Sequence, residues 1–290
     1  MQINQLHPRF VGEIIGLDTS APITPETIEA VEAAMAQYGV CVIRDASLTD
    51  EDHLRFSRAF GPLELAPGGG KRIAPEIFDV GNLDPNGEII QPNPEGPQAA
   101  DFELFHTDSP CNTMPTKWSL LLAYVTPPVG ANTEYIDLRA VYEDLPQETK
   151  DRIENLAAEH DLFHALELKS GKSVSDDLRK AYPRTPQALV RTSASGRKTL
   201  YLGWHAVGIV GWSEGEGRKL LSELYAFATQ DKYVYSHKWR PGDLVIWDNR
   251  CTMHSATSFE RYRYKRDMRR TTINEYGPEE LGIEGMRAAG

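Results

Sequence analysis

The sequence lacks any apolar run near the roughly 20 residues that a membrane-spanning helix needs. Its first residues also lack the basic and apolar segments of a secretory signal peptide. Only three cysteines are present, Cys41, Cys111 and Cys251, too few for a disulfide framework and typical of a reducing compartment. We therefore expect a soluble cytoplasmic protein without a membrane partner.

Positive charge is scarce as well. The chain has 31 Lys and Arg against 42 Asp and Glu, a formal net charge of −11. An acidic surface of this kind argues against binding to nucleic acid, although it leaves a local basic site open. No Gly-x-Gly-x-x-Gly or Walker pattern opens a predicted helix, so nucleotide-binding folds lose their support.

What the 290 residues do contain is the pattern of one large domain, mostly β with flanking helices. Thr24 and Thr49 can each cap a helix, and Gly39 and Gly61 can end those helices. A strand is predicted at 39–44. Further strands are predicted at 119–125, 133–137, 189–192, 199–202, 233–239, 243–247 and 269–273, and further helices at about 146–159 and 213–229. Short strands separated by turns favour a sandwich or jelly roll over a doubly wound sheet.

Residues 62–100 have a different character, because proline and glycine are dense on both sides of a short strand-like piece at 77–80. We expect a lid-like loop region here. Lys71 and Arg72 follow three consecutive glycines within it. They either reach an anionic substrate from the lid or are ordinary solvated loop charges, and Lys71 is counted among the substrate-binding candidates.

The segment directly after this region carries the most informative pair of residues. His106 and Asp108 are separated by one residue, so on a strand their side chains lie on the same face. His254, far downstream, can add a second imidazole. Two imidazoles and one carboxylate on one face of a metal are typical of non-haem Fe(II) oxygenases.

Near the C-terminal end, one predicted strand is rich in arginine. Arg266 and Arg270 would share a face of it with Met268 and Thr272. If that face is buried, the guanidinium groups require anionic partners, and their planar shape suits carboxylates. The alternative, a basic edge strand facing solvent, has about equal weight from spacing alone.

These features together resemble the taurine dioxygenase/2,4-dichlorophenoxyacetate dioxygenase family of Fe(II)- and 2-oxoglutarate-dependent oxygenases. The phenoxyacetate branch looks closer, on Gly196-Arg197-Lys198-Thr199-Leu200-Tyr201-Leu202 and His237-x-Trp239. The resemblance runs from about Tyr38 to Ile273. The motifs that carry it are Phe105-His106-Thr107-Asp108-Ser109, Pro127-Pro128-Val129-Gly130-Ala131-Asn132-Thr133, Trp239-x-Pro241-Gly242-Asp243-Leu244, Trp247-Asp248-Asn249-Arg250 and the arginine-rich strand.

The resemblance implies a double-stranded β-helix (a cupin-like jelly roll) and a role for each matching residue. His106, Asp108 and His254 would be the catalytic metal ligands that bind Fe(II). Thr133 and Arg266 would bind 2-oxoglutarate, and Arg270 would contact the acidic group of the substrate. O2 is the second co-substrate. Family members are often dimers or tetramers, so a homo-oligomer is left open.

The expected reaction is hydroxylation of a small anionic organic molecule with release of succinate and CO2. The branch resemblance favours ether cleavage of an aryloxyalkanoate, and a sulfonate or alkyl sulfate is the alternative within the same chemistry. A zinc hydrolase with the same three ligands and a non-catalytic cupin-like binding protein are the lower-ranked alternatives.

Four other histidines are possible site residues. His205 and His237 either line the substrate site or are core histidines with satisfied hydrogen bonds, and His205 is counted among the substrate-binding candidates. His160 and His164 have a helical metal spacing but lack the glutamate of a zinc-protease motif, so we expect neither to bind metal.

Overall fold

The computed structural model describes residues 1–66, 74–92, 104–112, 116–164, 167 and 173–275. Its largest sheet has seven strands in the order β1-β2-β3-β13-β5-β15-β4, antiparallel except for β2 and β3. The bounds of these strands are β1 Gln2–Gln5, β2 Gly12–Ile15, β3 Val40–Ile43, β13 Leu244–Asp248, β5 Thr116–Val125, β15 Asp267–Asn274 and β4 Phe78–Asp79.

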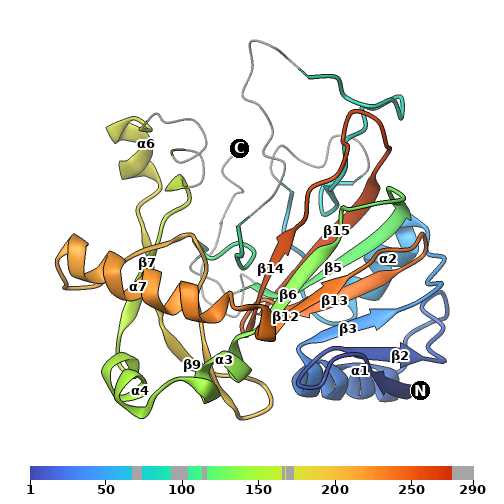
Figure 1. The fold of residues 1–290 in the computed structure, drawn as a ribbon. Helices are drawn as coiled ribbons and strands as arrows, with labels where there is room; N and C mark the ends of the chain where they lie inside the picture. The colour runs from blue at the N-terminus through green and yellow to red at the C-terminus, as the bar shows by residue number, and fades with distance from the viewer. Residues whose placement is uncertain (67–73, 93–103, 113–115, 165–166, 168–172, 276–290) are drawn as a thin grey trace.

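Each face of this sheet packs against a different partner, because side chains alternate along a strand. On β13, Leu244 and Ile246 join the core formed with the helices α1 (Pro25–Tyr38) and α2 (Asp50–Arg58). Val245 and Trp247 face the other way, into a second core. Figure 1 shows α1 and α2 beside the large sheet.

The second core lies between the large sheet and a three-stranded antiparallel sheet in the order β12-β6-β14. Its strands are β12 Val234–His237, β6 Thr133–Asp137 and β14 Thr252–Ala256. Tyr135 of β6 packs there with Trp247 of β13 and Met268 of β15. The two facing sheets therefore enclose the region to which β14 and β15 bring their functional side chains.

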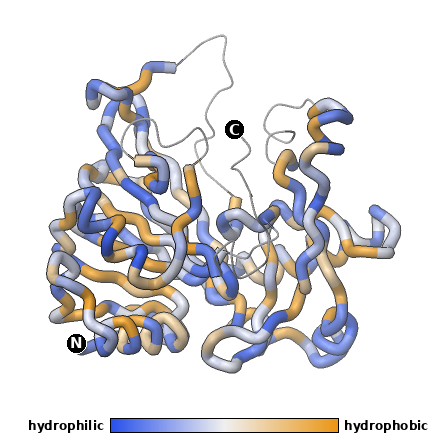
Figure 2. Tube along the Cα trace, turned by 180° about the vertical axis from the view of Figure 1, so that it is seen from behind, coloured by the Kyte–Doolittle hydropathy of each residue, from blue (hydrophilic) through white to orange (hydrophobic). Residues whose placement is uncertain are grey.

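The remaining elements form the other part of the molecule in Figure 1, and most of them contribute to a third core, although α6 buries no residue. These are α3 Leu138–Asp144, α4 Gln147–Ile153, β7 Ala157–His160, α6 Asp176–Ala181, β8 Thr185–Ala188, β9 Val190–Thr192, β10 Lys198–Leu200, β11 Ala206–Ile209, α7 Glu214–Ala228 and the short 3-10 helix Asp231–Tyr233. Figure 2 shows hydrophobic and hydrophilic stretches alternating along the chain in both parts, as expected where each element buries one side.

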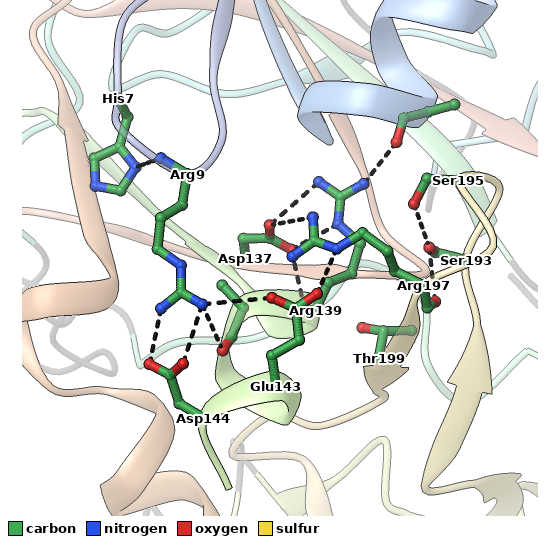
Figure 3. Close-up of polar contacts among 12 residues, drawn as sticks. His7, Arg9, Asp137, Arg139, Glu143, Asp144, Ser193, Ser195, Arg197 and Thr199 are labelled. Carbon is green, nitrogen blue, oxygen red and sulfur yellow. Dashed lines mark hydrogen bonds and ion pairs between the residues drawn. The ribbon is translucent and has the colours of Figure 1, made fainter.

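A buried ion-pair cluster at the end of β6 joins the two parts (Figure 3). The fully buried Arg139 donates from Nε to Asp137 at 2.8 Å and from Nη1 to the carbonyl of Ala36 in α1 at 2.7 Å. Arg197, beside β10, adds a contact of 3.6 Å to Asp137. Gly39, with φ 71°, leaves room for this guanidinium, since a Cβ there would lie 2.7 Å from Nη2 of Arg139. The cluster thus anchors the strand that carries Thr133 and Tyr135.

Most of the predicted elements are confirmed. Thr24 and Thr49 cap α1 and α2, and Gly39 closes α1 in the left-handed conformation. The strand predicted at 133–137 has the predicted bounds, and the strand-like piece at 77–80 contains β4. The helix predicted at 146–159 is wrong in its second half, because α4 ends at Ile153 and 157–160 form β7. In the described part of the chain, no helix is both long and apolar enough to cross a membrane.

Candidate active site

His106, Asp108 and His254 come together in the structure. Their potential ligand atoms all lie within 4.8 Å of one another. His106 and His254 form an antiparallel bridge, with backbone N–H to carbonyl distances of 3.0 and 2.8 Å. His254 lies on β14, whereas His106 makes only this isolated bridge and Asp108 follows it in a bend, so the two side chains meet the metal site without a regular strand at 106–108. The donor set of two imidazoles and one carboxylate fits a mononuclear iron centre with open coordination positions.

The protonation of these groups also suits a metal. Burial alone would raise the pKa of Asp108, but the charges of Arg270, His254 and His106 lower it to about 2. Burial, assisted by His106, lowers the pKa of His254 to about 3. The Nδ1–H of His106 can donate to the carbonyl of Leu104 at 2.8 Å, which leaves Nε2 as the metal-binding atom. At neutral pH the cluster thus offers a carboxylate and neutral imidazole, the forms that metal binding requires.

A buried hydrogen-bond network holds the Asp108 carboxylate in place. Ser119 on β5 donates to Oδ2 of Asp108 at 2.7 Å, and Asn249 donates to Ser119 at 2.9 Å. The side-chain oxygen of Asn249 accepts from the backbone N–H of Asp108 and from Trp247, both at 3.1 Å. Ser119 and Asn249 were not predicted as site residues, although Asn249 stands within a motif that carries the family resemblance.

Replacing Ser119 with alanine is expected to weaken metal binding by roughly 10- to 100-fold, the usual cost of losing a partner that orients a ligand. Titration of the metal-free protein with Mn(II) measures this. Ser57→Ala is a matched control, because Ser57 is equally buried and bonds Thr271, on the other face of β15 from Arg270. Equal Mn(II) affinity of the Ser119 variant and the wild type would contradict an orienting role.

His205 supports the backbone between the metal ligands His106 and Asp108. Its Nε2 accepts from the backbone N–H of Thr107 at 3.2 Å, and its Nδ1 lies 2.7 Å from Nδ1 of His160. Both ring nitrogens are therefore engaged, and both histidines are buried. This arrangement leaves no ring nitrogen of His205 for the predicted contact with substrate. It fits the alternative, a core histidine with satisfied hydrogen bonds. His160 ends the strand β7 rather than lying on a helix with His164, so the helical metal spacing is not formed.

The two residues expected to bind 2-oxoglutarate are both buried. Thr133 is 4% exposed, and its hydroxyl accepts from the indole N–H of Trp239 at 3.0 Å. Arg266 is 8% exposed, and its guanidinium donates to the carbonyl of Val80 at 3.1 Å. Thr133 begins β6 and Arg266 immediately precedes β15, and both residues act on the hydroxyl of Tyr135, which lies between the two sheets.

Arg270 reaches the metal-ligand cluster directly. Its guanidinium is hydrogen-bonded to the Asp108 carboxylate, and its Cζ lies 4.6 Å from the ring centroid of Phe78 in β4. Arg269 points to the other face and pairs with Asp50 at 2.6 Å. The alternative of a solvent-facing basic edge strand does not hold, because β15 lies between β5 and β4 and Arg270 faces inward.

Two predicted features of the 62–100 region have different outcomes. Lys71 lies outside the described residues. The described part of the region places Phe78 against Arg270, next to the metal ligands. A segment that contacts the site from this position is compatible with a lid, which stays a prediction.

Three adjacent ligands of this kind on a mostly β fold, with buried arginines beside them, define the class of mononuclear non-haem iron oxygenases. Comparison with known proteins gives the family. The family described as "Taurine catabolism dioxygenase TauD, TfdA family" matches residues 2–272, and the chain belongs to it. The resemblance seen in the sequence is thereby confirmed.

Individual relatives agree with this assignment. The chain is 37% identical over 285 residues, 94% of each protein, to an α-ketoglutarate-dependent 2,4-dichlorophenoxyacetate dioxygenase of Burkholderia sp. (strain RASC). It is 26% identical to an α-ketoglutarate-dependent sulfate ester dioxygenase of Pseudomonas putida, over 97% of this chain and 92% of that protein. The crystal structure of AAD-2 in complex with Mn(II) and N-oxalylglycine superposes with a TM-score of 0.85 at 38% identity, covering 94% of this chain and 97% of the other.

The protein is therefore an Fe(II)- and 2-oxoglutarate-dependent dioxygenase. This conclusion sets aside the two lower-ranked alternatives, a zinc hydrolase and a non-catalytic cupin-like binding protein.

Proposed function

We propose that this dioxygenase hydroxylates a small anionic organic molecule, and that its substrate is an aryloxyalkanoate. Arg270 carries the proposal. It is an inward-facing guanidinium in contact with a metal ligand, so a substrate carboxylate held by it would place its neighbouring carbon atoms beside the metal. The 37% identity to a 2,4-dichlorophenoxyacetate dioxygenase supports an aryloxyacetate as that carboxylate.

In this proposal each residue has one task. His106, Asp108 and His254 hold Fe(II), while Arg266 and Thr133 bind the distal carboxylate of 2-oxoglutarate. When bound, iron, 2-oxoglutarate and O2 supply the oxidising chemistry, which releases succinate and CO2. The protein's residues orient the substrate C–H bond and exclude water from the site. Hydroxylation of the carbon next to an ether oxygen gives a hemiacetal, which collapses to a phenol and a carbonyl compound.

A sulfonate or alkyl sulfate is the second candidate substrate. A guanidinium binds sulfate oxygens as readily as carboxylate oxygens. Relatives named as an alkylsulfatase and a sulfate ester dioxygenase share 25% and 26% identity with the chain. The lower identity of these relatives is the reason for ranking this substrate second.

The finer architecture follows the same proposal. We take residues 1–290 to be a single domain with a double-stranded β-helix, formed by the two sheets that face each other across Tyr135. Residues 62–100 would form the lid over the substrate. The TM-score of 0.85 to AAD-2 over nearly the whole chain supports one domain of this type. A cytoplasmic location and a homo-oligomeric state, dimer or tetramer, complete the proposal.

The test is a substrate screen with Fe(II), 2-oxoglutarate and O2, in which succinate, phenol and sulfate are measured together. We expect aryloxyacetates to release phenol and succinate in equal amounts. Sulfate release from alkyl sulfates, with no phenol from the aryloxy compounds, would instead support the second candidate. If none of these compounds stimulated succinate formation above the rate without substrate, the proposal of an aryloxyalkanoate or sulfate substrate would be wrong.

A further inference from the structure

Tyr135 has a hydroxyl group with an unusual environment. The residue is 0% exposed, yet among the described residues its hydroxyl makes no hydrogen bond of normal geometry. The Thr133 hydroxyl lies near it and interacts with it, but outside normal hydrogen-bond geometry, and it already accepts from the indole N–H of Trp239 at 3.0 Å. Buried hydroxyl groups are nearly always paired, because an unpaired one loses its hydration without compensation. A phenylalanine would fill the same place in the core without this cost, so the hydroxyl calls for a partner.

The ring of Tyr135 is held firmly, so the direction of the hydroxyl is fixed. Tyr135 on β6 is the direct cross-strand neighbour of His254 on β14. Its ring stacks on that of His254, with centroids 6.3 Å apart and an interplanar angle of 28°. Trp247 packs against it with a centroid distance of 5.7 Å. The metal-ligand strand and the large sheet therefore both constrain the side chain.

The charges that act on the hydroxyl locate it further. Asp108 and Arg266 both act electrostatically on it. Thr133 lies two residues earlier on the same face of β6. The hydroxyl is thus close enough to a metal ligand and to the arginine proposed for the distal carboxylate to be influenced by both.

We propose that Tyr135 donates a hydrogen bond to the carboxylate of 2-oxoglutarate that Arg266 and Thr133 also bind. This inference rests on the proposed binding roles of those two residues and adds a third donor to them. A buried carboxylate can accept several hydrogen bonds at once. A tyrosine offers its proton at little entropic cost, because its ring is already immobilised. The missing partner of the hydroxyl is, in this view, the co-substrate itself.

The experiment compares Tyr135→Phe with the wild type in 2-oxoglutarate binding to the Mn(II)-loaded protein, by calorimetry without turnover. We expect the dissociation constant for 2-oxoglutarate to rise roughly 10- to 100-fold, the usual cost of one hydrogen bond to a charged group. Mn(II) affinity without 2-oxoglutarate should be unchanged. The unfolding temperature of the ligand-free variant should be equal or higher, because the substitution removes an unpaired buried hydroxyl. In turnover with Fe(II), KM for 2-oxoglutarate should rise while kcat changes little.

Tyr235→Phe is the matched control. Tyr235 is the neighbour of Tyr135 on β12, but its ring packs on His7 and Phe10, away from the metal ligands. We expect this variant to bind 2-oxoglutarate as the wild type does. An unchanged 2-oxoglutarate affinity in Tyr135→Phe, or a rise in KM for the primary substrate instead, would overturn the role proposed for Tyr135 but not the proposed 2-oxoglutarate site. Failure of the wild type to bind 2-oxoglutarate would overturn the proposed binding site as well.

Discussion

Replacing His106 with alanine is expected to abolish turnover and the visible absorption band that forms when Fe(II) and 2-oxoglutarate are added without oxygen. The substitution removes one of only two imidazoles from the ligand cluster, and Asp108 and His254 cannot supply a third donor. The loss should exceed the roughly 10- to 100-fold that changes in outer hydrogen-bond partners cause. Anaerobic spectrophotometry and succinate release measure the two effects separately.

His164→Ala provides the control for His106→Ala. His164 stacks on Trp204 and is absent from the cluster of potential metal ligands, so its replacement should leave the band in place. Circular dichroism establishes that both variants are folded. A folded His106→Ala protein that kept the band and the succinate release would show that the iron is bound elsewhere.

The metal ligands could be predicted because their geometry is local. His106 and Asp108 need only the two-residue period of an extended chain, and His254 lies four residues after the Trp247-Asp248-Asn249-Arg250 motif that carries the family resemblance. The groups that support them could not be predicted from spacing. Ser119 and Asn249 are 130 residues apart, and only the register of β5 with β13 brings them together.

The errors in the predicted elements have a similar origin. Residues 157–160, Ala-Ala-Glu-His, extend the helical pattern of α4, and their local preference favours a helix. In the structure they form β7, which pairs with β8 and β11. β14 was not predicted either, because no proline or glycine separates it from β13. Long-range pairing thus outweighs local preference in both segments.

His205 shows why a correct location does not give a role. The sequence placed it in the neighbourhood of the site, and the structure agrees, since it bonds the backbone between two metal ligands. Its role depends on whether its ring nitrogens are available, and His160 engages one of them. That contact joins residues 45 positions apart, which periodicity cannot reveal.

Arg266→Ala and Arg270→Ala are expected to weaken the binding of different ligands, the first that of 2-oxoglutarate and the second that of the primary substrate. Arg266 is nearly buried and lies on the side of the site where Thr133 and Tyr135 gather, so its loss should weaken 2-oxoglutarate binding. Arg270 contacts Asp108 and Phe78, so its loss should weaken binding of the anionic substrate. Loss of one partner from a buried charge pair costs roughly 2–5 kcal/mol, or about 30-fold to several thousandfold in affinity.

The measurement is a pair of dissociation constants for each variant, one for 2-oxoglutarate and one for the aryloxyacetate, with Mn(II) bound. Arg269→Ala is the control, because Arg269 stands beside Arg270 but pairs with Asp50 on the opposite face of β15. Equal losses for both ligands in both variants would refute the division of roles.

Arg270 also neutralises Asp108 in this structure, so its loss has a second expected consequence. Metal binding competes with Arg270 for the same carboxylate, and Arg270→Ala should therefore bind Mn(II) at least as tightly as the wild type. A guanidinium displaced from Asp108 by the metal would then be available to the substrate only once the metal is in place.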